Sequence, residues 1–67
     1  MTGIIKRVRA DKGFGFLRGD DEAHDRFFHV SALRGIDIAT LAEGTRVQFE
    51  HEDGDKGPRA TNIQPLS

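Results

Sequence analysis

The stretch KGFGFL at residues 12–17 decides the fold, because two phenylalanines alternate there with two glycines behind a lysine. Alternate side chains of a strand point to the same face, so Phe14 and Phe16 share one face while Gly15 and Leu17 share the other. If the rings formed the core face, Leu17 would be left in water. We therefore expect Leu17 to lie inside, the glycines to let a tightly curved wall close, and both rings to stand on the surface.

In the segment RFFHV at residues 26–30, one face of the strand must again be assigned to the core. Phe27 and His29 share one face, and Phe28 and Val30 share the other, which is the better core pair. Together with the two earlier rings, Phe27 and His29 would then form an outer aromatic patch. Such a patch is costly for a monomer unless something stacks on it. Nucleobases are the obvious candidates, since stacking on an aromatic ring is worth about 1–3 kcal/mol per base.

The rest of the chain reads as short strands and turns. Five stretches are rich in β-forming residues, and they span residues 2–10, 13–18, 26–30, 45–51 and 59–63. Turn residues cluster at 11–13 and 53–58, and residues 31–42 have room for a helical turn but not for a regular helix. This pattern predicts an all-β fold, a small closed or nearly closed antiparallel barrel. A β-sandwich with the rings as core, and Leu17, Phe28 and Val30 outside, is the alternative.

Composition limits the possible classes of protein. The chain has 67 residues and no cysteine, which predicts one domain over residues 1–67 without disulfides or a thiolate metal site. Its apolar runs are too short for a membrane span or a signal-peptide core. A soluble cytoplasmic protein is therefore expected.

Charge is segregated along the chain although the formal net charge is only −1. Residues 1–18 carry five Lys or Arg side chains against one Asp, a local balance of +4, whereas residues 20–25 and 50–55 each carry four acids and no Lys or Arg. A separate basic surface can bind phosphates while the whole chain stays near neutral. The basic first strand is the predicted source of phosphate contacts.

These motifs resemble those of a known family. KGFGFL is similar to the RNP1 motif, and RFFHVSAL at residues 26–33 to the RNP2 motif, of the bacterial cold shock proteins. The segments MTGIIK, ADKGFGF, LAEGTRVQF and KGPRATNI also resemble that family in order and spacing. The resemblance runs from about Met1 to Ile63. A domain of the RNA-recognition-motif type is disfavoured, because it needs two helices that this chain cannot supply.

The resemblance implies a five-stranded OB-fold barrel that holds single-stranded RNA or DNA and acts as an RNA chaperone, often in the cold. By motif position, Phe14, Phe16, Phe27 and His29 would be stacking platforms. Lys12 would contact a phosphate or a base edge, and the resemblance places Lys6 close to the bound strand. With the two arginines of the first strand added, the expected nucleic-acid-binding residues are Lys6, Arg7, Arg9, Lys12, Phe14, Phe16, Phe27 and His29.

Strand one departs from the family pattern. The family usually has a Trp-Phe pair where Arg7 and Val8 stand, and two further aromatic positions are occupied by Val30 and Ile38. Arg7 can lay its guanidinium plane on a base, and Arg9 adds charge, so binding should depend more on electrostatics and less on stacking. Because Ile5 and Val8 both favour burial, this strand would need a bulge or a sharp twist.

Two other classes of function compete with nucleic-acid binding. A barrel that binds a proline-rich or extended peptide could use the same aromatic patch, although such barrels usually rely on Trp and Tyr, which are absent here. An enzyme is disfavoured, because His24, His29 and His51 show no spacing that resembles a metal site or a nucleophile–base pair. We therefore expect no cofactor, no metal, no small-molecule substrate and a monomer.

Overall fold

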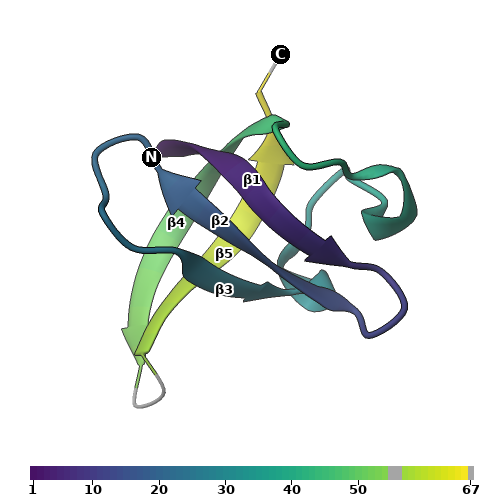
Figure 1. Cartoon of the computed structure of the whole chain (residues 1–67), viewed down its shortest axis with the longest axis horizontal. Helices are drawn as coiled ribbons and strands as arrows, with labels where there is room; N and C mark the ends of the chain where they lie inside the picture. Colours follow the sequence, from purple (N-terminus) through teal and green to yellow (C-terminus); the bar gives the residue numbers. More distant parts are fainter. Residues whose placement is uncertain (55–56, 67) are drawn as a thin grey trace.

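The chain forms five strands and two short 3-10 turns in a computed structural model that describes residues 1–54 and 57–66 (Figure 1). The elements are β1 (Thr2–Arg9), β2 (Phe14–Gly19), β3 (Arg26–His29), η1 (Val30–Ala32), η2 (Ile38–Thr40), β4 (Arg46–Gly54) and β5 (Gly57–Pro65). All five predicted strands are confirmed, and β4 and β5 extend further than expected. In the predicted turn at 53–58, Asp55 and Lys56 lie outside the described residues.

The strands close into a barrel in the order β1-β2-β3-β5-β4. β1, β2 and β3 lie side by side as an antiparallel meander, and β4 and β5 form a hairpin that crosses behind them (Figure 1). Antiparallel pairing of β1 with β4 closes one side of the barrel, and a short parallel contact between Phe27 of β3 and Arg59 of β5 closes the other. The predicted all-β barrel is confirmed, with a parallel pairing where β3 meets β5.

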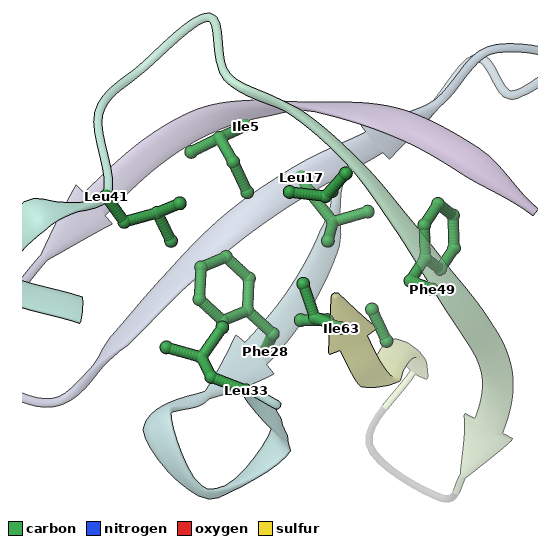
Figure 2. Packing of buried hydrophobic residues seen from close by; sticks show 9 residues of the cluster. Ile5, Leu17, Phe28, Leu33, Leu41, Phe49 and Ile63 are labelled. Atoms are coloured by element: carbon green, nitrogen blue, oxygen red, sulfur yellow. The ribbon is translucent and has the colours of Figure 1, made fainter. Parts of the chain in front are cut away.

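The core fills the inside of the barrel. Figure 2 shows its side chains pointing toward one another from the strands and from the segments that carry Leu33 and Leu41. The buried members are Ile5, Leu17, Phe28, Leu33, Leu41, Val47, Phe49, Ala60 and Ile63. Leu17 and Phe28 are inside as predicted, which excludes the β-sandwich alternative that placed them outside.

Strand β1 contains the irregularity that its sequence requires. Its register with β2 shifts between Ile5 and Arg7, so Lys6 is the extra residue of a bulge. Ile5 is buried and Val8 packs against the core from the far side of the bulge. The bulge thus lets both apolar residues face inward and turns Arg7 to the outer face.

The prediction that Val30 belongs to the core was wrong. β3 ends one residue earlier, at His29, and Val30 is 37% exposed. The side chain of His29 accepts a hydrogen bond from the backbone N–H of Ser31 and caps η1. Because the 3-10 turn begins at Val30, strand alternation no longer applies to that side chain.

Candidate nucleic-acid interface

Three phenylalanine rings meet on the outer face of β2 and β3. The ring centroids of Phe14 and Phe16 are 6.0 Å apart, and Phe27 lies 5.7 Å from Phe14 and 5.9 Å from Phe16. Each ring is half-buried and lies outside the core cluster. Mutual packing of this kind is worth about 0.5–1.5 kcal/mol per pair, so the rings support one another without a ligand. We call these three side chains and His29 the ring face.

Gly15 explains how the ring face stays close to the barrel wall. A Cβ at this position would lie 2.5 Å from the carbonyl oxygen of Arg7 and 2.6 Å from Cζ of Phe28. The missing side chain therefore lets β1 and the core ring of Phe28 pack directly against β2. This confirms the expectation that a glycine permits tight closure while the flanking rings point outward.

The arginines of β1 lie beside the rings. In the register of β1 with β2, Arg7 is opposite Phe16 and Arg9 is opposite Phe14, and opposed residues share a face. Lys6, Arg7, Phe16 and Asp25 line one shallow hollow at this edge. All the basic side chains of β1 are exposed. The bulge thus brings Lys6, Arg7 and Arg9 to the same side of the barrel as the rings.

Lys12 lies in the turn between β1 and β2. The backbone N–H groups of Lys12 and Gly13 both donate to the carbonyl of Arg9, at 3.1 and 2.9 Å. Gly13 has φ +74°, which a glycine adopts without strain. The Lys12 side chain is exposed at the end of the ring face that Phe14 occupies, and no hydrogen bond or ion pair in the described part of the chain holds it.

His29 completes the ring face opposite Phe14. Its Nδ1 accepts the backbone N–H of Ser31 at 3.2 Å, and the Ser31 Oγ lies 3.0 Å from the same nitrogen. A neutral ring in this arrangement carries its proton on Nε2, which leaves that N–H available as a donor. His29 is exposed, so the donor is accessible from solvent.

Ion pairing divides the arginines into two groups. Arg18 pairs with Asp25 at 2.8 Å and Arg46 pairs with Asp20 at 2.9 Å. Within residues 1–54 and 57–66, no ion pair or side-chain hydrogen bond engages Arg7, Arg9 or Arg59. These are the three arginines that lie opposite or beside a ring-face residue in the strand registers. Positive charge on this side is therefore free to meet phosphates.

A buried ion pair anchors the start of β3. Arg26 is only 8% exposed, and its Nε donates to both carboxylate oxygens of Glu22 at 2.7 and 2.8 Å. This hydrogen bonding lowers the pKa of Glu22 and, together with Asp53, raises the pKa of Arg26. The burial of Arg26 could not be predicted from the sequence, because it depends on closure of the barrel.

Two departures from the family pattern are visible in the structure. Ile38 is half-buried and packs against the core, and it has no aromatic ring to stack on a base. Val30 is exposed and its methyl group approaches Gly13 beside the ring face. Sequence reasoning also did not place Arg59 beside Phe27, because that position follows from a pairing between strands far apart in the chain.

Comparisons with known proteins agree on one family. The family model for the "Cold-shock" DNA-binding domain matches residues 1–66. Cold shock protein 2 of Lactiplantibacillus plantarum is 49% identical over 64 residues, which are 96% of each chain. Cold shock-like protein CspB of Yersinia pestis is 48% identical over 66 residues, which are 98% of this chain and 94% of the relative.

A solved structure supports the same assignment. The structure of drosophila Unr CSD456 superposes with a TM-score of 0.75 at 27% identity, over 98% of this chain. This chain spans about a quarter (26%) of that longer protein. With a barrel of the expected topology, a matching family model and relatives of nearly equal length, the chain belongs to the cold shock domain family of nucleic-acid-binding proteins.

Proposed function

We propose that this protein is an RNA chaperone of the cold shock type, which holds single-stranded RNA or DNA on the ring face. The observation that carries the proposal is the contact of Phe14, Phe16 and Phe27 on the outer surface beside the exposed cations Arg7 and Arg9. Bases would stack on the rings and on His29, while the strand-one cations hold phosphates. Lys6 would contribute from the adjoining hollow, and Lys12 from the turn.

The chaperone activity follows from the kind of strand that this surface accepts. Rings can stack only on bases that have left a duplex, so binding favours unpaired RNA over folded RNA. Each bound molecule would therefore shift a hairpin toward its open form by mass action. Residues 1–67 would act as one domain and as a monomer in the cytoplasm, with no small-molecule substrate.

The described residues contain no helix long and apolar enough to cross a membrane. Within residues 1–54 and 57–66, no group of three or more His, Asp or Glu side chains is placed to hold a metal ion. The family points to binding and not to catalysis. A peptide would use the rings but would not require the exposed cations beside them, so the peptide-binding alternative is less well supported.

The test compares a labelled pyrimidine-rich oligonucleotide with a blunt duplex of the same sequence by fluorescence anisotropy. The label belongs on the nucleic acid, since the chain has no Trp or Tyr. The single strand should bind far more tightly, and its affinity should fall as salt rises. Equal affinity for both forms, or salt-independent binding, would contradict the proposal.

A further inference from the structure

The ring face continues past the rings onto β5. Strand registers place Arg7 opposite Phe16, Phe16 opposite Phe27, and Phe27 beside Arg59. Paired residues in neighbouring strands point to the same side, and the neighbours on the other face agree, because Phe28 and Ala60 are both buried. A single row therefore crosses four strands, with two rings in the middle and one arginine at each end.

The backbone at Arg59 is held firmly while its side chain is exposed. The carbonyl of Arg59 accepts a hydrogen bond from Nη1 of the buried Arg26 at 3.2 Å, and Arg26 is itself held by Glu22 and Asp53. The side chain of Arg59 is exposed, and no described residue pairs with it. An exposed guanidinium on a fixed backbone is well suited to meet an anion that arrives from solution.

Charge changes sign immediately beyond Arg59. In the β4–β5 register the next residue of the row is Glu52, and Glu50 and Asp53 are also exposed on β4. Carboxylates at these positions repel a phosphate backbone. The row thus ends in a cation followed by acids, which sets a boundary for a bound polyanion between β5 and β4.

From this placement we propose that Arg59 binds a phosphate of the single strand, so that the interface crosses β1, β2, β3 and β5 and stops at Glu52. The inference rests on the proposed function, and it adds a binding residue and an edge to it. The contact is to the backbone of the nucleic acid and is independent of base sequence. Arg59 is then the counterpart of Arg7 at the other end of the row.

The experiment measures binding of labelled single strands to three variants at several salt concentrations. Arg59→Gln removes the proposed phosphate contact. Arg46→Gln is the matched control, because it changes the net charge equally but lies on β4 opposite Ile4 and pairs with Asp20. Glu52→Gln removes the carboxylate at the boundary.

For single strands, log K falls against log salt with a slope of about −0.7 per neutralised phosphate. Arg59→Gln should therefore flatten the slope by about 0.7, equally for an oligo-dT and a mixed sequence. The ratio of wild-type to Arg59→Gln affinity should shrink about 2.6-fold as the salt concentration rises fourfold. Arg46→Gln should leave the slope unchanged, and Glu52→Gln should tighten binding at low salt, a gain that a misfolded variant cannot show.

Three results would overturn the inference. If Arg59→Gln has the same affinity and salt slope as Arg46→Gln while the wild type binds, the interface ends at β3. If Arg59→Gln loses affinity only for strands that contain guanine, with an unchanged slope, Arg59 reads a base and not a phosphate. If Glu52→Gln does not tighten binding, β4 is not the boundary. Failure of the wild type to bind any single strand would instead refute the proposed function.

Discussion

Replacement of Gly15 by alanine tests the packing that supports the ring face. The new Cβ would lie 2.5 Å from the carbonyl oxygen of Arg7 and 2.6 Å from Cζ of Phe28. Neither neighbour can move easily, because one is backbone of a paired strand and the other is a ring only 1% exposed. Overpacking of this kind costs about 1–3 kcal/mol, and two rigid contacts place Gly15→Ala near the upper end. The loss of a glycine from the unfolded chain returns about 0.4–1 kcal/mol.

The net loss of about 2 kcal/mol is large for a domain of this size. At about 0.05–0.15 kcal/mol per residue, 67 residues give a total stability of about 3–10 kcal/mol. For a domain this small, 2 kcal/mol lowers the melting temperature by about 8–16 °C. Thermal unfolding followed by circular dichroism measures this directly.

Gly54→Ala is the matched control for the same chemical change. Among the described residues its Cβ would meet only Cδ of Arg59, at an ordinary 3.8 Å, and its φ lies outside the left-handed region. The control should therefore stay within about 0.5 kcal/mol of the wild type. If Gly15→Ala has the same melting temperature as Gly54→Ala, the reasoning that the barrel wall closes at Gly15 is refuted.

Three further predictions test the faces, the charges and the buried ion pair. Phe16→Ala should weaken single-strand binding by about 1–3 kcal/mol while the protein stays folded. Phe28→Ala should instead lower the free energy of unfolding by about 3–5 kcal/mol. If thermal melts show that both variants are equally destabilised, the assignment of the two faces is wrong. Arg7→Ala should flatten the salt slope of binding by about 0.7, and an unchanged slope in anisotropy titrations would show that β1 faces away from the nucleic acid. Hydrogen bonds from Arg26 lower the pKa of Glu22 in the folded state, so their stabilisation is present above the unfolded pKa of about 4.3 and is lost as pH falls through the folded pKa. Glu22→Gln should accordingly be less stable than the wild type at pH 7, with the gap narrowing below about pH 4 in denaturant titrations; a gap that widens on acidification would contradict this linkage.

Much of the fold could be predicted because local pattern and burial agree. Alternation around Leu17 and along β4, where Val47 and Phe49 are buried between exposed neighbours, predicts which side faces inward. The conflict between Ile5 and Val8 indicates the bulge. Val30 was misplaced because the hydrogen bond from Ser31 to His29 ends the strand, and side-chain capping of that kind overrides simple alternation.

The candidate site was predicted where it depends on neighbours in sequence and missed where it depends on closure of the barrel. Phe14 and Phe16 are two residues apart, so their shared face follows from strand geometry. Arg59 and Arg26 acquire their positions from the parallel contact between β3 and β5, which no local pattern reveals. Roles in binding remain predictions for all of these residues.

The most direct test of the central claim, that the ring face is the nucleic-acid-binding surface, is an NMR titration of the labelled protein with a short single strand. Saturable shifts should be largest for Phe14, Phe16, Phe27 and the outward arginines of β1. They should be smallest for outward residues of β4 such as Gln48, which lies opposite Thr2 on another side of the barrel. Shifts centred on β4, with the three phenylalanine rings unmoved at saturation, would contradict the account.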